Sequence, residues 1–265
     1  MTADGARPLP PPYPPGRNLL AGRTVLVTAA AGTGIGFAGA KRCVEEGATV
    51  MISDLHERRL GEAAAQLRDI AADRVHARTC DVTRQEQVDA LVAGAIDTLG
   101  HVDVLINNAG LGGTATLVDM PDEEWSKVID VSLTSVMRMT RAILPHMHGR
   151  RTGAIVNNAS VLGWRAQSGQ SHYAAAKAGV MALTRCSAIE SAPFGVRINA
   201  VAPSIAMHAF LARTTTPELL EELARREAFG RPAEVWEVAN VMVFLASDLA
   251  SYLTGEVLSV SSQHP

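Results

Sequence analysis

Between Arg23 and Val260, short apolar and β-branched runs alternate with longer segments in which apolar residues recur every three or four positions. The short runs predict strands and the longer segments predict helices. We expect strands at residues 24–28, 49–53, 75–78, 104–107, 154–157, 197–201 and 257–260, and helices at residues 34–46, 57–70, 85–99, 123–147, 171–192 and 234–249. Apolar strands that alternate with helices pair in parallel and are covered on both faces. The pattern therefore predicts an α/β fold with one doubly wound parallel sheet of about seven strands.

The N-terminal segment differs in composition from the rest of the chain. Six of the 13 prolines fall within residues 8–15. Because proline fixes φ and lacks a backbone donor, residues 1–18 are expected to form an extended arm outside the core. The arm is either a ligand for proline-binding modules or a tail that lies on the surface or on a neighbouring subunit. Residues 19–265 show no internal repeat or linker and are predicted to form a single domain.

Composition and charge exclude several classes of protein. The formal net charge of the 265 residues is −3, and no dense Lys/Arg run marks a nucleic-acid surface. No apolar stretch is long enough to span a membrane, and no secretory signal is visible. The three cysteines, Cys43, Cys80 and Cys186, are far apart and lack metal-ligand spacing. We therefore expect a soluble cytoplasmic protein that binds a small molecule, without metal, nucleic acid or membrane.

A glycine-containing turn follows the first predicted strand. Residues 28–36 read Thr-Ala-Ala-Ala-Gly-Thr-Gly-Ile-Gly and open a helix. Small residues at this place let the backbone approach a pyrophosphate, whose charge the helix N-terminus stabilises. The alternative is an ordinary tight turn between a strand and a helix. The candidate dinucleotide-binding residues of the turn are Thr28, Gly32, Gly34, Ile35 and Gly36.

An acidic residue at the end of the second strand indicates which dinucleotide binds. Asp54 lies 18 residues after Gly36. A carboxylate there accepts hydrogen bonds from the adenosine ribose and repels a 2′-phosphate. Asp54 therefore favours NAD over NADP, although the neighbouring Arg58 and Arg59 could accommodate a phosphate.

The order of motifs from about Leu20 to Val260 resembles the classical short-chain dehydrogenase/reductase family. The matching motifs are Asp81-Val82, Asn107-Asn108-Ala109-Gly110, Ser160 placed 13 residues before Tyr173, Tyr173-Ala-Ala-Ala-Lys177, and Ala202-Pro203. The resemblance implies a Rossmann-like fold, hydride transfer between NAD(P) and a secondary alcohol or ketone, and a homotetramer built through the helix bearing Tyr173 and the C-terminal strand.

The resemblance also assigns cofactor contacts to individual positions. It implies that Asp81 and Val82 hold the adenine ring and that Lys177 binds the nicotinamide ribose. The remaining cofactor-binding candidates that it implies are Asn108, Ala109, Gly110, Tyr173, Pro203 and Ile205.

The chemistry of Tyr173 follows from its helical spacing to a lysine. Lys177 is four residues further along, so both side chains share one helix face. At an effective dielectric constant of about 20, a cation about 5 Å away is worth roughly 3 kcal/mol, which lowers a tyrosine pKa by about 2 units. Tyr173 would then exchange a proton with the substrate oxygen, and Ser160 would orient that oxygen. The alternatives are a half-buried helix tyrosine and a strand-end serine bonded to its own backbone.

Four places depart from the family pattern, and one of them is Pro203-Ser204, where the family usually has Pro-Gly. Alanines replace the first glycine of a turn that is one residue longer than usual, and because alanine resists positive φ, we expect a different loop path with Gly32 making the tight turn. Ser132 stands where the family has an active-site asparagine, and its main-chain carbonyl could hold the same water, so Ser132 is the fourth catalytic candidate. The usual terminal Asp-Gly-Gly reads Ser261-Ser262-Gln263.

Substrate specificity is expected from a lid at about residues 204–232. The segment contains the apolar residues Met207, Phe210 and Leu211, then an apolar pattern of helical period at residues 219–229, and four arginines: Arg213, Arg225, Arg226 and Arg231. This mixture suits a hydrophobic acyl group on an anionic carrier such as coenzyme A, or else a solvated amphipathic helix. The turn and residues 203–206 also resemble an actinobacterial subgroup linked to steroid-ring catabolism. His172 either contacts substrate or lies on the surface.

Two other functions remain open at this point. One is an NADPH-dependent 3-oxoacyl reductase that acts on a carrier protein or coenzyme A thioester. The other belongs to a different class, a dinucleotide-binding sensor or scaffold that has lost turnover. Ser132 and the altered turn motivate that second alternative, and the intact set of Ser160, Tyr173 and Lys177 argues against it.

Overall fold

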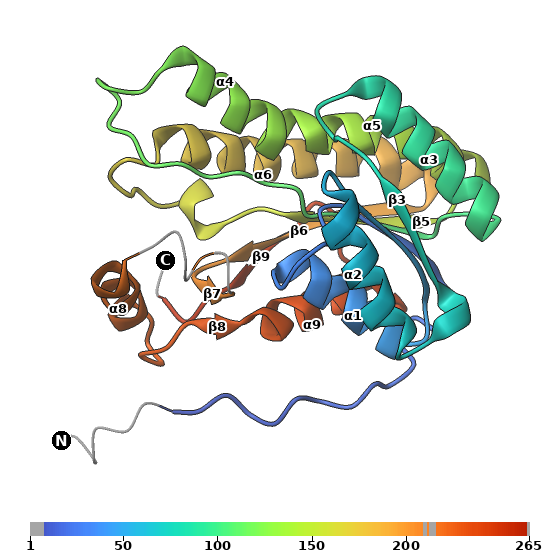
Figure 1. The fold of residues 1–265 in the computed structure, drawn as a ribbon. Coiled ribbons are helices and arrows are strands. Elements are labelled where there is room, and N and C mark those ends of the chain that lie inside the picture. The colour runs from blue at the N-terminus through green and yellow to red at the C-terminus, as the bar shows by residue number, and fades with distance from the viewer. Residues whose placement is uncertain (1–7, 209–210, 212–215, 264–265) are drawn as a thin grey trace.

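The computed structural model describes residues 8–208, 211 and 216–263, and its centre is a seven-stranded parallel sheet (Figure 1). The strand order is β3-β2-β1-β4-β5-β6-β9. The strands are β1 (Thr24–Val27), β2 (Thr49–Asp54), β3 (Val75–Thr79), β4 (Val104–Asn107), β5 (Gly153–Asn158), β6 (Val196–Pro203) and β9 (Val257–Val260). The predicted α/β fold with a doubly wound parallel sheet is confirmed.

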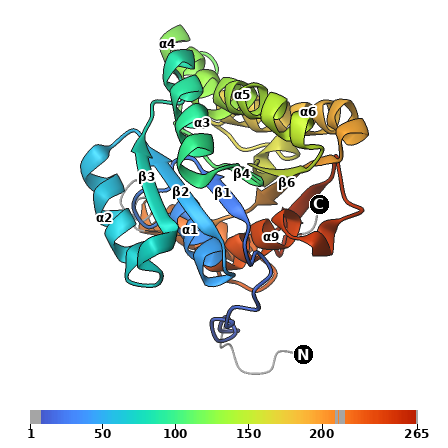
Figure 2. The same cartoon turned by 90° about the vertical axis from the view of Figure 1, so that its right-hand side faces the viewer.

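Helices cover both faces of the sheet (Figures 1 and 2). One layer holds α1 (Ile35–Glu45), α2 (Glu57–Arg68) and α9 (Val235–Ala246), and the other holds α3 (Gln85–Leu99), α4 (Asp122–Ile129), α5 (Ser135–Arg150) and α6 (Ser171–Ser191). Alternate strand residues supply the two cores: Val25 and Val27 pack in the first layer, and Leu26 packs in the second. Fully burying such a side chain contributes about 1.5–3 kcal/mol.

Two details of the fold were not predicted. The helical region expected at residues 123–147 contains a π-helix, Asp130–Thr134, between α4 and α5. A second, two-stranded sheet pairs β7 (Ala206–Met207) with β8 (Ala233–Glu234), and α8 (Pro217–Arg226) lies between these strands in the chain. In Figure 1, α8 lies beside this small sheet at one end of the molecule.

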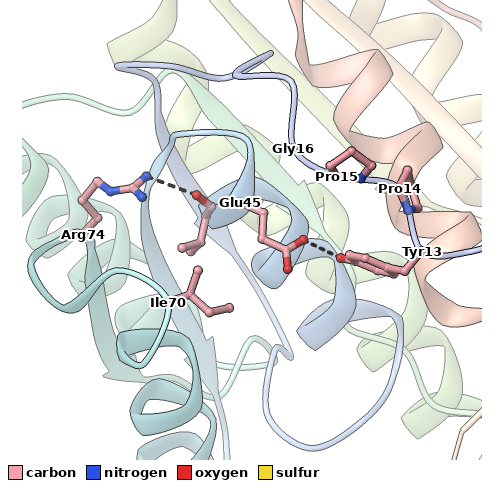
Figure 3. A pocket seen from close by; sticks show the side chains of 8 residues that line it. Tyr13, Pro14, Pro15, Gly16, Glu45, Ile70 and Arg74 are labelled. Carbon is pink, nitrogen blue, oxygen red and sulfur yellow. Dashed lines mark hydrogen bonds between the residues drawn. The ribbon is translucent and has the colours of Figure 1, made fainter.

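Residues 8–18 of the N-terminal arm follow the outside of the domain and are fixed where they meet α1. The Tyr13 hydroxyl donates a hydrogen bond to the Glu45 carboxylate over 2.5 Å (Figure 3). The backbone amides of Arg17 and Leu19 donate to the buried carboxylate of Glu46, over 2.8 and 3.0 Å. Between the arm, α1 and the end of α2 is a cavity of about 410 Å³ lined by Tyr13, Pro14, Pro15, Gly16, Val44, Glu45, Ile70 and Arg74.

Nothing in the described part of the chain adds a metal or membrane site. No helix there is both long and apolar enough to cross a bilayer. The described residues also contain no group of three or more His, Cys, Asp or Glu side chains placed to hold a metal ion. Cys43 and Cys80 are buried and Cys186 is exposed, and all three are free thiols.

Candidate active site

The candidate residues gather at the carboxyl ends of the central strands. Thr28 follows β1, Asn108 follows β4, Ser160 follows β5, and Pro203 ends β6. Because parallel strands present their carboxyl ends at one edge of the sheet, these residues lie close together although they are far apart in the chain. Open α/β sheets bind ligands at this edge.

Ser160, Tyr173 and Lys177 form one cluster. Ser160 precedes a short 3₁₀ turn, and its Oγ accepts a hydrogen bond from the Leu162 amide over 3.2 Å. Tyr173 and Lys177 share one face of α6, and Lys177 Nζ lies 5.5 Å from the centre of the Tyr173 ring. The Ser160 side chain hydrogen-bonds the phenol. Lys177 is only 2% exposed, and its Nζ donates to the Asn158 carbonyl over 2.6 Å.

Burial controls the protonation of this cluster. It raises the pKa of the Tyr173 phenol to about 12, and the hydrogen bond with Ser160 opposes the rise. It lowers the pKa of the Lys177 amine to about 8. The predicted lowering of the tyrosine pKa is therefore wrong for the chain by itself. The reason is that removal from water disfavours both the phenolate and the ammonium group, so the attraction between them does not dominate.

Ser132 is fully buried within the π-helix Asp130–Thr134. Its Oγ donates to the Leu111 carbonyl and accepts from the Leu111 amide, both over 2.9 Å. The side chain thus connects the loop after β4 to the π-helix. Single π-helical turns are frequent at functional sites. A role of Ser132 in proton transfer would have to come from its main-chain carbonyl, as the sequence predicted, and remains a prediction.

The turn after β1 follows the expected path at one residue and departs from it at another. Gly32 has a φ of +90°, as expected for the tight turn. Ala29, however, has a φ of +49°, so the expectation that alanine avoids the left-handed region is wrong here. This conformation costs an alanine about 1–2 kcal/mol. The Asn108 side-chain amide donates to the Ala29 carbonyl over 2.9 Å and so helps to hold it.

The start of α1 fits a dinucleotide pyrophosphate. Gly34 caps the helix without a side-chain hydrogen bond, and Ile35 is the first helical residue, so no cap side chain occupies the first amides. A Cβ at Gly36 would lie 2.3 Å from both the Ala29 carbonyl oxygen and Asn108 Nδ2. The backbone therefore packs so closely at this point that only glycine fits.

The adenosine side of the site is acidic. Asp54 is partly buried and accepts hydrogen bonds from the Ala31 amide over 3.2 Å and the His56 amide over 3.0 Å. Burial raises the pKa of the Asp54 carboxyl, while the hydrogen bonds and Arg59 oppose the rise. The exposed Arg58 side chain pairs with Glu62. Of the two arginines that could accommodate a 2′-phosphate, Arg59 is thus the one whose charge acts on Asp54.

The other predicted cofactor residues surround the same edge. Thr28 Oγ1 accepts from the amides of Asn108 and Ala109, over 3.0 and 3.4 Å. Asp81 accepts from the Thr83 amide and hydroxyl, over 2.9 and 2.7 Å, and the neighbouring Val82 is partly buried. A Cβ at Gly110 would lie 3.4 Å from Lys177 Nζ. Pro203 is buried, and the Ile205 carbonyl accepts from the Ala233 amide over 2.9 Å.

Sequence reasoning missed Asn158, which connects the turn to Lys177. Its Nδ2 donates to Asn108 Oδ1 over 2.9 Å, and its carbonyl accepts from Lys177. A chain of amide contacts therefore runs from Ala29 through Asn108 and Asn158 to Lys177. The signal in the sequence was the pair Asn157-Asn158 at the end of an otherwise apolar strand.

The substrate side comprises the described parts of the predicted lid. Phe210 and Arg213 lie outside the described residues. Arg226 pairs with Glu222 and Arg231 with Glu237, while Arg225 is exposed at the end of α8. His172 is fully buried, with its Nε2 3.3 Å from Glu124 Oε1, so the expectation of a surface histidine is wrong. It packs inward because it shares one face of α6 with Ala176 and Val180, which are also buried.

Comparisons with known proteins show similarity over nearly the whole chain. A family model described as enoyl-(acyl carrier protein) reductase matches residues 29–262. A Mycobacterium tuberculosis protein named (5R,7aS)-5-hydroxy-7a-methyl-1-oxo-2,3,5,6,7,7a-hexahydro-1H-indene-carboxyl-CoA reductase is 64% identical over 254 residues, covering 94% of this chain and 96% of the relative. A 3-oxoacyl-(acyl-carrier-protein) reductase from Thermotoga maritima is 38% identical over 91% of this chain and 97% of its own length. The crystal structure of a short-chain dehydrogenase from Mycobacterium smegmatis, 59% identical, superposes with a TM-score of 0.86 over 96% of this chain and 98% of its own.

Proposed function

Because the chain belongs to the short-chain dehydrogenase/reductase family and is an NAD(P)-dependent oxidoreductase acting on CH–OH groups, we propose that it transfers hydride between NAD(H) and a ring-bearing secondary alcohol or ketone carried on coenzyme A. The observation that carries the proposal is the cluster of Ser160, Tyr173 and the buried Lys177 beside the dinucleotide turn. The 64% identity to an indene-carboxyl-CoA reductase supports the class of substrate.

Each residue of the cluster has a distinct role in this proposal. The bound dinucleotide gives or takes the hydride. Tyr173 holds the proton that the substrate oxygen gains on reduction and loses on oxidation, and Ser160 orients that oxygen through a hydrogen bond. Lys177 holds the nicotinamide ribose, and the Ser132 carbonyl holds a water of the proton path.

The cofactor preference rests on the turn and on Asp54. The first amides of α1 face the pyrophosphate, with Thr28, Gly32, Gly34, Ile35 and Gly36 forming the turn. The Asp54 carboxylate accepts hydrogen bonds from the ribose hydroxyls and repels a 2′-phosphate, which favours NAD over NADP. Asp81 and Val82 border the adenine, while Asn108, Ala109, Gly110, Pro203 and Ile205 border the nicotinamide half.

The assembly and location belong to the same proposal. One face of α6 is exposed, including Ile189 at 77%, and β9 is an edge strand of the sheet. Both are available to pair with further copies, which supports a homotetramer. The three free thiols suit a reducing compartment, the cytoplasm.

The test is a fluorescence titration with NADH and NADPH. We expect NADH to bind at least tenfold more tightly than NADPH, and Asp54→Ala to narrow this difference because it removes the repulsion of the 2′-phosphate. A clear preference for NADPH would instead favour the 3-oxoacyl reductase function suggested by the Thermotoga maritima relative. Failure to bind either dinucleotide would contradict the enzyme proposal.

Turnover separates an enzyme from a dinucleotide-binding sensor. We expect Tyr173→Phe to lower kcat by about 10²–10⁴-fold, because it removes the proton-transferring hydroxyl while leaving the ring in place. The NADH Kd of this variant should stay within about twofold of wild type. Initial rates with a ring-bearing hydroxyacyl-CoA and NAD measure the first quantity. Comparable turnover in both proteins would remove the proton-transfer role of Tyr173, and absence of wild-type turnover would favour the sensor.

A further inference from the structure

The chain segment after β9, residues 261–263, lies between the end of the lid helix and the loop that carries Ser160. We call these three residues the C-terminal tail. The Ala228 amide donates to the Ser262 carbonyl over 3.1 Å, and the Phe229 amide donates to Ser262 Oγ over 3.4 Å. The tail therefore binds the residues that directly follow α8.

The carboxylate of Glu227 is the centre of these contacts. Glu227 directly follows the last residue of α8 and is only 4% exposed. Glu227 Oε2 accepts from the Ser262 amide over 3.2 Å and from Ser262 Oγ over 2.9 Å, and Oε1 accepts from Gln263 Nε2 over 2.7 Å. A carboxylate buried without donors is costly. The position of the lid end thus depends on the tail, which supplies these three hydrogen bonds.

Gln263 extends the contact to the catalytic loop. While its Nε2 donates to Glu227, its Oε1 accepts a hydrogen bond from Arg165 Nη1, and Arg165 Nη2 donates to the Gln263 carbonyl over 3.3 Å. Arg165 lies five residues after Ser160 and directly after Trp164. One amide side chain thereby joins the cation of the catalytic loop to the carboxylate of the lid.

Two exposed aromatic residues lie close in sequence to the ends of this bridge. Trp164 is 50% exposed beside Arg165, and Phe229 is 57% exposed beside Glu227. The Arg231 guanidinium lies over the Phe229 ring at 5.9 Å. Large apolar side chains that remain exposed at the edge of a site are available to bind an apolar ligand.

We propose that Gln263 is a specificity-determining residue and that the C-terminal tail is a latch. The latch holds the lid against the loop that carries Ser160. Trp164 and Phe229 then form two walls for a bulky ring-bearing acyl group. The inference rests on the proposed function for the class of substrate. Gln263 suits this place because its amide offers an acceptor to Arg165 and a donor to Glu227 at once. A small alcohol does not reach both walls and is indifferent to the latch.

The test uses two single variants and one compensating pair. Gln263→Leu removes both hydrogen bonds, and Gln263→Glu faces Glu227 with a second carboxylate. In the double variant Gln263→Glu/Glu227→Gln, residue 263 still accepts from Arg165 and residue 227 becomes the donor. Gln66→Leu, on the exposed face of α2, is the matched control. For each protein we would measure kcat and KM with a ring-bearing hydroxyacyl-CoA and with cyclohexanol, the NADH Kd, and hydrogen exchange of the α8 amides.

We expect both single variants to raise KM for the hydroxyacyl-CoA about tenfold, with kcat, NADH Kd and the KM for cyclohexanol within about twofold of wild type. Hydrogen exchange in α8 should rise about tenfold in the single variants and return toward wild type in the double variant, because a donor again faces an acceptor between residues 227 and 263. The control should change none of these quantities.

Two results would overturn the inference: equal KM changes for both substrates, and unchanged α8 exchange in both single variants. If the wild-type protein does not turn over the hydroxyacyl-CoA but α8 exchange responds as expected, the proposed substrate fails, and with it the specificity role of Gln263, while the latch itself stands.

Discussion

At the scale of single residues, the site depends on a charge that is kept away from water. Lys177 is almost wholly buried in α6, and the backbone carbonyl of Asn158 accepts a hydrogen bond from its amine. Burial lowers the pKa of that amine to about 8 from its ordinary value of 10.5. A buried amine of this kind costs stability, because burial disfavours its charged form.

The cost should be visible as a pH dependence of stability. The native chain releases its Lys177 proton near pH 8, whereas the unfolded chain holds it to about pH 10.5. Between these values the unfolded state binds more protons, so the free energy of unfolding rises with pH. Lys177→Met lacks this contribution. We therefore expect the stability of the Met variant relative to wild type to fall by about 2–3 kcal/mol between pH 7.5 and 10.5.

Urea unfolding at pH 7.5, 9 and 10.5 measures this difference. Lys127→Met, which removes an exposed lysine of α4, is the matched control and should show a relative stability that does not change over the same range. A constant difference for Lys177→Met as well would mean that the buried amine keeps its ordinary affinity for protons.

At the scale of elements, the turn between β1 and α1 and the loop after β4 form one unit. Ala29 adopts a φ of +49°, and the Asn108 side chain, from the end of β4, holds its carbonyl. The start of α1 then packs against both groups at Gly36. A side chain at Gly36 would push these two groups apart and so change the path of the turn.

We expect Gly36→Ala to weaken dinucleotide binding. Its Cβ would lie 2.3 Å from the Ala29 carbonyl oxygen and Asn108 Nδ2, so the turn would have to move apart. The expected result is an NADH Kd raised at least tenfold and a free energy of unfolding lowered by about 1–3 kcal/mol. Titration and urea unfolding measure the two effects.

Gly61→Ala is the control for that substitution, because a Cβ at Gly61 in α2 meets nothing within 4 Å. This variant should leave the NADH Kd unchanged and raise the free energy of unfolding by about 0.5–1 kcal/mol. The same loss of affinity in both variants would contradict the packing argument at Gly36.

At the scale of the whole molecule, the first and last described segments of the chain are bound to the domain at two different places. The N-terminal arm is held at α1 and touches α9, where the Tyr13 ring meets Trp236 edge-on with ring centres 5.5 Å apart. The C-terminal tail is held between the lid and the catalytic loop. The first attachment lies outside the catalytic cluster, and the second lies next to it.

Removal of residues 1–16 should therefore affect stability and not catalysis. It deletes the Tyr13 contacts with Glu45 and Trp236 but keeps the amides of Arg17 and Leu19 on Glu46. We expect a loss of about 1–2 kcal/mol, or a Tm lower by about 2–8 °C. The value of kcat/KM should stay within about twofold.

Thermal unfolding, initial rates and size-exclusion chromatography check this prediction, with removal of residues 1–9 as the control that keeps Tyr13. A changed oligomeric state in the shorter chain would show that the arm also lies on a neighbouring subunit, the alternative that the sequence left open.

The sequence by itself determined the parallel sheet, the place of the dinucleotide turn and the spacing of Ser160, Tyr173 and Lys177. These properties depend on local pattern, since hydrophobic period, turn residues and helical spacing act within a few positions of the chain. The positive φ of Gly32 was predictable for the same reason.

Only the tertiary structure decided the direction in which the Tyr173 and Lys177 pKa values move, because burial is produced by segments that are distant in sequence. The positive φ of Ala29 likewise depends on Asn108, which lies 79 positions away. The bridge from Arg165 to Gln263 joins residues 98 positions apart, and no periodicity or motif in either segment indicates the other. Contacts of that range arise when the layers of the fold close, and these contacts set the electrostatics and the walls of the site.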